Sequence, residues 1–406
     1  MTGAAAAARR AAAAPRRPPV TPAGLVDALR LASARPGVVE PTELQAAVAR
    51  VDHVRLARLA VSQRVAGAAA RSLARIVSQE AAGELKRAAK RQGLLHHLVC
   101  LAQLETLGDA LGAAGVPWLV VKGPALAELA YLDAPRPYAD LDIVVPGRSF
   151  GDALDALART GGAVIDRNWD LVCAGPRGQL HLTTGAPATV DLHWHLVNLA
   201  EQRRRFRVPM DELFERRRTA ALGQARAHVL EATDMLCHVA LHATLSGGHQ
   251  LGWLADVDRC VVNMAPDWDE LVARSLAWRV NLPVAVALQR ARRVLGAPVP
   301  GAVLDALARG PAGTVLLRAM GDWRPDGRLP GGGSIGRGVS RSLRDGLGRT
   351  AAAAWGEATA MVRRQVDHHE YWNDPEDPRN IMFPTGDGQG LARYLRLVAA
   401  TDRFGH

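Results

Sequence analysis

Lysine is almost absent from this chain of 406 residues: among 50 basic residues only Lys86, Lys90 and Lys122 are lysines. The others are arginines, a bias expected of a GC-rich gene. A lysine kept at position 122 hints that a compact ammonium group is needed there. The net charge of +10 is a weak nucleic-acid signal, because four of these charges are arginines of the first 20 residues. We therefore expect no nucleic-acid partner.

Cysteine is scarce as well. The four cysteines are widely spaced and form no Cys-x-x-Cys pair, so we expect reduced thiols in the core rather than a disulfide framework or a thiolate metal site. No apolar run reaches the roughly 18 residues typical of a membrane span. The first 20 residues are mostly Ala, Arg and Pro and lack the apolar centre of a secretory signal. The expected location is the cytoplasm.

Hydrophobic content of 48% and a length sufficient for two or three domains indicate a globular protein with a sizeable core. Apolar residues at helical spacing predict helical regions over 22–115 and 201–308. The predicted strands fall at 118–121, 141–145, 163–166, 171–174, 180–183 and 189–196, with a helix over 149–160. Residues 116–200 thus form a small α/β core. The remaining expected segments are a disordered tail over 1–21, a Gly/Pro/Arg-rich loop over 309–349, and a C-terminal helix and tail over 350–406.

The sequence from Val120 to Pro146 contains a pair of carboxylates, Asp140 and Asp142. Residues two apart on a strand point to the same face, so these two side chains can converge on one or two metal ions. The β-branched residues that follow anchor the strand in a buried sheet. In haloacid-type phosphatases and many metal-dependent glycosyltransferases the apolar strand instead precedes the acidic pair. The order found here favours nucleotidyl transfer.

A third carboxylate is available on the segment 189–196, where polar and apolar residues alternate. Asp191, His193 and His195 share one face of this predicted strand. If it neighbours the strand of residues 141–145, Asp191 can reach Asp140 and Asp142. Nucleotidyl transfer requires a divalent metal bound by such carboxylates, often as a pair of ions.

The turn Lys122-Gly123-Pro124 follows an apolar strand and starts a predicted helix. Gly123 permits close approach of the backbone, and Pro124 suits the first helical position. Because a helix N-terminus attracts phosphate, we expect Lys122 and Gly123 to hold a triphosphate. Arg136, in the loop before Asp140, is a further candidate for contacting phosphate.

An ordered set of motifs resembles the uncharacterised bacterial nucleotidyltransferase family of the polymerase-β superfold. The motifs are Lys122-Gly123, Arg136-Pro137, Asp140-Leu-Asp142-Ile-Val-Val and Val190-Asp191-Leu-His193-Trp194. A later segment with His238, His242, Trp253 and Asp256 is similar to the helical half of that family, so the resemblance covers about residues 90–300.

The resemblance implies an α+β fold, in which a small mixed sheet is flanked by helical regions at both ends. It also implies Mg²⁺ (or Mn²⁺) as the cofactor and an NTP as the donor. The expected reaction moves a nucleoside monophosphate to a hydroxyl or phosphate of an unknown small-molecule, peptide or protein acceptor, releasing pyrophosphate. Asp140, Asp142 and Asp191 are the expected metal ligands, and Asp191 is also the candidate catalytic base.

The chain departs from the superfold at one point, because Lys122-Gly123-Pro124 replaces the usual Gly-Ser at the helix start. The serine hydroxyl that would hold the triphosphate is missing, so Lys122 must substitute for it or phosphate binding is altered. Two other functional classes stay open: a catalytically silent nucleotide-binding or scaffold protein of a biosynthetic cluster, and a metal-dependent glycosyltransferase.

Other polar residues have structural interpretations beside the functional ones. His193 and His195 orient the site or pack in preference to binding metal. His238 and His242 are four apart on a helix and could bind zinc, but they lack the glutamate of the His-Glu-x-x-His pattern. Asp256 either caps a helix or lines the acceptor pocket. The arginine-rich stretch over 203–218 is interleaved with acids, which favours a solvated helix face over an RNA site.

Overall fold

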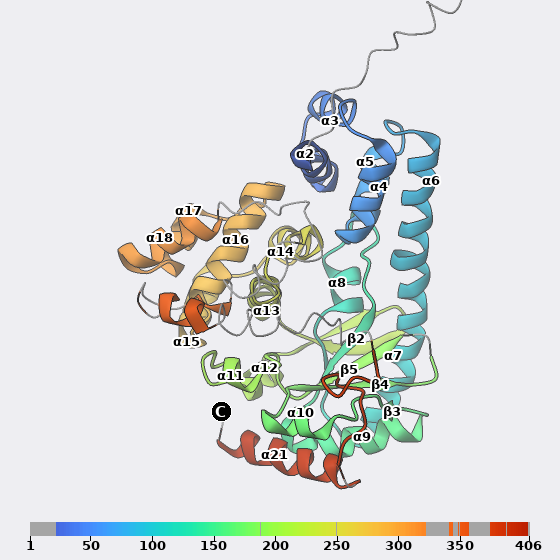
Figure 1. Cartoon of the computed structure of the whole chain (residues 1–406), viewed down its shortest axis with the longest axis vertical. Coiled ribbons are helices and arrows are strands. Elements are labelled where there is room, and N and C mark those ends of the chain that lie inside the picture. Colours follow the sequence, from blue (N-terminus) through green and yellow to red (C-terminus); the bar gives the residue numbers. More distant parts are fainter. Residues whose placement is uncertain are drawn as a thin grey trace, which may run out of the picture.

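The computed structural model describes residues 22–186, 188–248, 250–321, 341–343, 348, 350–356, 374–386 and 388–404. It is an α+β structure in which one mixed sheet is surrounded by helices from both ends of the chain, as the sequence predicts. In Figure 1 the helices α2 to α6 form the upper part of the molecule and the sheet lies below them.

The sheet has seven strands in the order β3-β4-β5-β2-β1-β7-β6. The central strands β2 and β5 run parallel, with Asp142 paired to Asp191, whereas β1 is antiparallel to β2 and parallel to β7. The strands are β1 (Leu119–Val120), β2 (Asp140–Val144), β3 (Ala163–Val164), β4 (Gln179–Thr183), β5 (Thr189–His193), β6 (Arg218–Leu222) and β7 (Ala225–Val229). Five of the six predicted strands are confirmed, most of them shorter than predicted.

The hairpin of β6 and β7 was not predicted, because residues 201–308 were expected to be helical throughout. Gly223, with φ of +59°, lies in the two-residue turn between these strands, where a left-handed residue suits a hairpin. The expectation of a solvated face is also wrong for Arg203, which is buried and lies 4.4 Å over the Trp194 ring. Its guanidinium donates to the carbonyls of residues 176, 197 and 198 instead of meeting water.

The N-terminal helices form a core of their own that packs on the rest of the chain. They are α2 (Pro22–Ser33), α3 (Pro41–Val48), α4 (His53–Ser62), α5 (Ala66–Leu73) and α6 (Gln79–Ala88), and the π-helical segment Ala89–Leu95 joins α6 to α7 (His96–Ala113). Their buried residues share one apolar cluster with Leu251, Leu254 and Leu295 of later helices. Each amphipathic helix thus buries its apolar stripe against the next.

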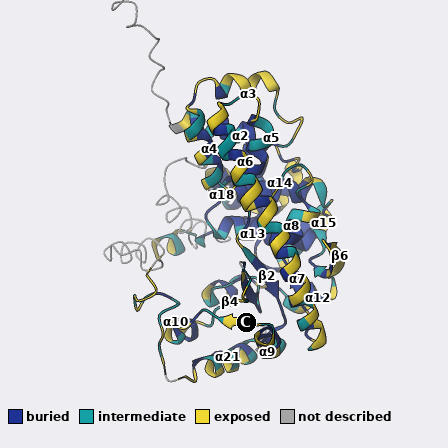
Figure 2. Ribbon diagram, turned by 90° about the vertical axis from the view of Figure 1, so that its right-hand side faces the viewer, coloured by how far each residue is buried: buried dark blue, intermediate teal, exposed yellow. Residues whose placement is uncertain are grey.

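The later helices pack on the sheet or on one another. Helix α8 (Gly123–Leu129) contacts the strands β1, β2 and β6 and packs on α14 (Leu251–Asn263), which packs in turn with α13 (Ala232–Leu245) and α16 (Asn281–Leu295). The other helices are α9 (Phe150–Arg159), α10 (Trp169–Ala174), α11 (Ala200–Arg203), α12 (Met210–Glu215), α15 (Trp268–Ala277), α17 (Gly301–Leu307), α18 (Gly310–Gly321) and α21 (Gly390–Phe404), with a short 3-10 turn at Gly147–Ser149. Figure 2 shows the contrast in burial between α13, which is almost wholly buried, and α3, which is mostly exposed.

Two further predictions are wrong. Residues 171–174 are not a strand but part of α10, where the Asn168 side chain caps the helix and Val172 and Cys173 are buried next to α21. A short apolar run fits either structure, and here the capping residue decides. The loop predicted over 309–349 contains α18, whose Leu317 and Met320 are buried. Pro311 suits the first turn of that helix.

Several predictions concern residues that the structure does not describe. The tail over 1–21 and most of the loop over 322–349 lie outside the described residues. Of the helix expected within 350–406, residues 350–356 are helical, and 357–373 are not described. Within the part of the chain that is described, no helix has the length and apolarity needed to cross a membrane.

Candidate functional site

The parallel pairing of β2 and β5 brings Asp142 and Asp191 to neighbouring positions on one face of the sheet. His193, two residues further along β5, points to the same face and places its Nε2 3.2 Å from Oδ1 of Asp142. One ligand atom from each of the three residues lies within 4.8 Å of the other two. Asp142 is only 2% exposed, so this cluster is buried. The condition set from the sequence, that these two strands are neighbours, is therefore met.

Lys122 lies two residues past β1, directly before α8, and contacts the carboxylate of Asp142. Its Nζ is 2.8 Å from Oδ1 of Asp142. Burial alone would raise the pKa of Asp142, but the Lys122 ammonium and the hydrogen bond from His193 hold it well below its ordinary range. Burial also disfavours the charged form of Lys122, yet the nearby carboxylates, Asp142 first, raise its pKa. The pair is thus a fully charged buried ion pair.

Gly123 forms the tight turn that follows Lys122. Its φ is +45°, and a Cβ at this position would lie 3.2 Å from the Asp140 carbonyl oxygen and 3.5 Å from the Tyr138 ring. A glycine is therefore required for the close approach of this turn to the start of β2. The helix α8 that follows has only seven residues. Asp140 lines the adjacent cavity but is not a member of the three-residue cluster.

Asp191 has polar neighbours on β4 that the sequence analysis did not identify. Gln179 donates to Oδ2 of Asp191 at 2.8 Å, and His181, paired opposite Asp191, has its Nε2 3.8 Å from Oδ1. Asp166 accepts from Nδ1 of His181 at 2.9 Å. Burial alone would lower the pKa of His181, but Asp166 and Asp191 raise it to about 9. Alternation along 179–183 was the available signal, because Gln179 and His181 share one face.

Burial raises the pKa of Asp191, and the charge of His181 opposes this shift without reversing it. Asp142 and Asp140 add to the rise, because like charges disfavour ionisation. The two paired aspartates thus differ: Asp142 has a matched cation within contact, and Asp191 is held by a neutral amide and a more distant histidine.

Arg136 is held by Asp256 of α14. Two nitrogens of its guanidinium donate to the two oxygens of Asp256 at 2.7 and 2.8 Å, and the Tyr131 hydroxyl donates to Oδ1 at 2.7 Å. Nη1 of Arg136 is buried and has no hydrogen-bond partner among the described residues. Asp256 does not cap α14, because this helix begins five residues earlier, at Leu251. It lines the cavity, and its place in an acceptor pocket stays a prediction.

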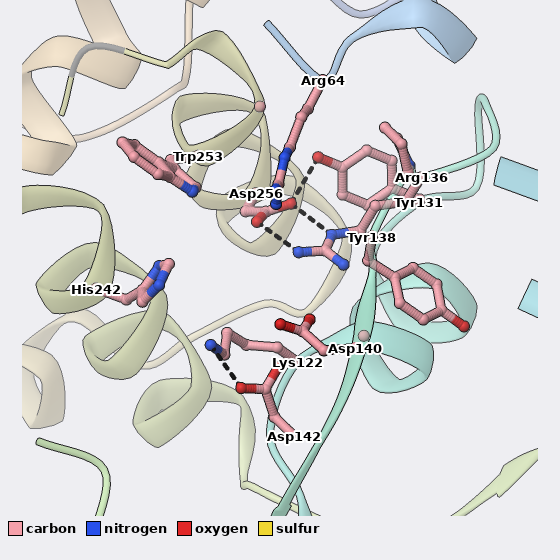
Figure 3. Close-up of a pocket in the computed structure, with 13 residues that line it drawn as sticks. Arg64, Lys122, Tyr131, Arg136, Tyr138, Asp140, Asp142, His242, Trp253 and Asp256 are labelled. Atoms are coloured by element: carbon pink, nitrogen blue, oxygen red, sulfur yellow. Dashed lines mark hydrogen bonds and ion pairs between the residues drawn. The ribbon is translucent and has the colours of Figure 1, made fainter. Parts of the chain in front are cut away.

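A cavity of about 140 Å³ joins these groups. Figure 3 shows Lys122 and Asp142 at one end and Arg136, Asp256 and Arg64 at the other, with Asp140 between them. The lining residues are Arg64, Lys122, Gly123, Tyr131, Arg136, Pro137, Tyr138, Asp140, Asp142, His242, Gly252, Trp253 and Asp256. Pockets that enclose whole small molecules usually measure about 300 Å³ or more. This cavity is therefore smaller than a pocket that encloses a whole small molecule.

The remaining histidines have different environments. Burial lowers the pKa of His238 to about 3 and that of His242 well below its ordinary value, and Lys122 adds to both shifts. Both rings are therefore neutral at pH 7. Among the described residues, the only group of three potential metal ligands is Asp142, Asp191 and His193, so the two helical histidines lack a third ligand there. His195 lies beyond the end of β5, where its Nδ1 accepts from the Val197 amide.

The donor atoms of the three-residue cluster suit a divalent cation. Carboxylate oxygens are the ligands of Mg²⁺ and Mn²⁺, and an imidazole nitrogen favours transition metals. Nδ1 of His193 is buried without a hydrogen-bond partner among the described residues, so one of its ring nitrogens remains available beyond the contact with Asp142. These residues therefore fit a metal ion, provided that Lys122 yields its place on Asp142.

Comparison with known proteins identifies a family. The model of a family described as uncharacterised nucleotidyltransferase matches residues 49–296. This range includes the whole sheet, the cavity and the helices α13 and α14. Neither the curated proteins nor the solved structures give a match.

Proposed function

The chain belongs to this family of uncharacterised nucleotidyltransferases, and from that premise we propose that it moves a nucleoside monophosphate from an NTP to an acceptor hydroxyl or phosphate. The observation that carries the proposal is the direct pairing of Asp142 with Asp191 on parallel strands beside Lys122. Carboxylates fixed on a rigid sheet are what a metal-bound triphosphate requires.

A divalent ion, Mg²⁺ or Mn²⁺, would be held by Asp142 and Asp191, with His193 beside them and Asp140 as a further ligand. When bound, it would neutralise charge on the triphosphate and polarise the phosphorus that is attacked. To bind Asp142, the metal ion would have to replace the Lys122 ammonium. The charges suit this replacement, because Asp142 is ionised and the ammonium is the flexible end of a lysine side chain. Once released from Asp142, Lys122 is free to contact a phosphate oxygen.

Arg136 would supply a second phosphate contact. Its bidentate bond to Asp256 fixes the plane of the guanidinium, and the third nitrogen keeps its hydrogen-bonding capacity. Figure 3 shows this group on the side of the cavity across from Lys122. A triphosphate lying between them would meet a cation at each end.

The reaction forms a bond between the acceptor oxygen and the α-phosphorus and breaks the bond from that phosphorus to the bridging oxygen, so pyrophosphate leaves. A hydroxyl acceptor loses its proton to the Asp191 carboxylate. Gln179 and the protonated His181 keep that carboxylate in place. Protonated His181 also limits the negative charge that accumulates around Asp191.

The test is calorimetric titration of each NTP into the full chain with and without Mg²⁺. We expect metal-dependent binding of at least one NTP, its loss in Asp142→Asn, and its retention in the control Asp152→Asn on the exposed face of α9. Release of pyrophosphate upon addition of an acceptor completes the assay. Tight binding of UDP-sugars in preference to NTPs would instead support a glycosyltransferase. NTP binding with no transfer to any acceptor would support the scaffold role.

A further inference from the structure

Arg64 has a backbone conformation that residues other than glycine seldom adopt. It lies in the turn between α4 and α5 with φ of +55°, in the left-handed region that favours glycine. Such strain persists where the surroundings enforce it, and it is concentrated at functional sites. The sequence gives no hint of this position, because Arg64 is one arginine among many in a helical stretch.

The start of α14 holds this turn in place. The Gly252 amide donates to the Gln63 carbonyl at 2.9 Å, and the Leu251 amide donates to Oε1 of Gln63 at the same distance. A Cβ on Gly252 would lie 2.9 Å from Cβ of Arg64, so only glycine lets α14 approach this closely. The same helix carries Trp253 and Asp256, which line the cavity. Arg64 is therefore fixed to the wall that already holds Arg136.

The guanidinium of Arg64 reaches the cavity without a partner. Arg64 is one of the lining residues, and Figure 3 shows its side chain entering from the N-terminal helices. Throughout the described residues it makes no side-chain hydrogen bond or ion pair, whereas Lys122 is paired with Asp142 and Arg136 with Asp256. Arg64 is thus the cation of the cavity whose charge is not already matched. A planar guanidinium with free donors is suited to a phosphate group.

We propose that Arg64 binds the triphosphate of the donor nucleotide, so that the N-terminal helices contribute directly to the active site. This inference rests on the proposed function and adds a phosphate-binding residue that lies outside the sheet. The strained turn aims the side chain at the cavity before the nucleotide arrives, which lowers the entropic cost of the contact.

The test uses magnesium tripolyphosphate as a probe that is independent of the base, titrated into the full chain and into Arg64→Gly. Glycine suits a positive φ, so this variant keeps the turn and should not lose thermal stability. The matched control is Arg279→Gly, because Arg279 is also exposed and has φ of +59° but lies between α15 and α16, away from the cavity. We expect affinity for tripolyphosphate to fall about tenfold in Arg64→Gly and to stay unchanged in Arg279→Gly.

Each outcome decides something. Equal affinity of Arg64→Gly and the unchanged chain overturns the inference and leaves the proposed function standing. If the unchanged chain binds no tripolyphosphate with or without Mg²⁺, both fail. A loss in Arg64→Gly together with normal Mg²⁺-dependent binding in Asp142→Asn supports the anion site but contradicts the proposed metal site. If an NTP binds the chain without displacing bound tripolyphosphate, Arg64 belongs to a site for a phosphorylated acceptor, and its assignment to the donor is overturned.

Discussion

Replacement of Lys122 by methionine tests the central ion pair. Methionine has a similar length and keeps the apolar contacts of the lysine stem. It leaves the Asp142 carboxylate buried, with His193 as its one side-chain partner among the described residues. At 2.8 Å and an effective dielectric constant of about 20, the attraction between the two charges is roughly 6 kcal/mol before the cost of burying them. Breaking a buried pair typically costs about 3–5 kcal/mol. We expect a loss of about 3 kcal/mol, because the hydrogen bond from His193 remains.

The same variant reveals whether Asp142 binds metal. In the unchanged chain a metal ion must displace Lys122 from Asp142, whereas in Lys122→Met it meets an uncompensated carboxylate. Metal at 100 times its dissociation constant stabilises a protein by about 2.7 kcal/mol. Added Mn²⁺ should therefore restore most of the stability of Lys122→Met and raise that of the unchanged chain by less.

The assay is thermal unfolding of both proteins in a chelator and in excess Mn²⁺. In chelator we expect Tm of Lys122→Met to lie roughly 5 °C below that of the unchanged chain. Equal Tm values in chelator would refute the stabilising role of the ion pair. An equal Mn²⁺-induced shift in the two proteins would refute the idea that lysine and metal compete for Asp142.

Three further predictions concern the neighbours of this pair. The pKa of His181 is raised to about 9, so its contribution to stability is complete below about pH 6.5 and is lost as the pH rises through 9. The free energy of unfolding measured in urea should therefore fall by about 2 kcal/mol over that range, and this fall should be absent in His181→Gln. Asp256→Asn should lower the free energy of unfolding by about 3 kcal/mol, because the buried Arg136 loses its charged partner. Adding Arg136→Met should restore part of this loss, which is measured by unfolding the single and double variants. His193→Asn should reduce the ratio of Mn²⁺ to Mg²⁺ affinity about tenfold, and an unchanged ratio in calorimetry would exclude imidazole as a ligand.

The central part of the fold could be predicted because its signals are local. The β-branched run after Asp142 and the alternation around Asp191 each indicate a strand with a buried face, and both strands are present. The pairing of these strands was stated as a condition, since no local pattern fixes which strands are neighbours. The hairpin of β6 and β7 was missed because arginines obscure its alternation and its turn is the uncommon pair Gly223-Gln224. Helix α10 was missed because four apolar residues fit a strand equally well.

The candidate site divides in the same way. The positions of Lys122, Asp140, Asp142 and Asp191 were predicted from spacing, and the structure brings these residues around one cavity and one carboxylate cluster. Their roles as ligands and as base stay predictions. Arg64 could not be found, because its place depends on contacts between segments almost 190 residues apart, such as the bond from the Leu251 amide to Gln63. Such contacts have no local signature in a sequence.

The wall of the cavity is held from behind by buried charges that join the N-terminal helices to α14. Arg259 on α14 is fully buried; it donates to Asp133, which also accepts from Arg71 of α5. Its neighbour Asp258 accepts from Arg35, which follows α2, at 2.9 Å. Removal of either partner of a buried pair is costly, so this network fixes the register of α14 against the N-terminal helices.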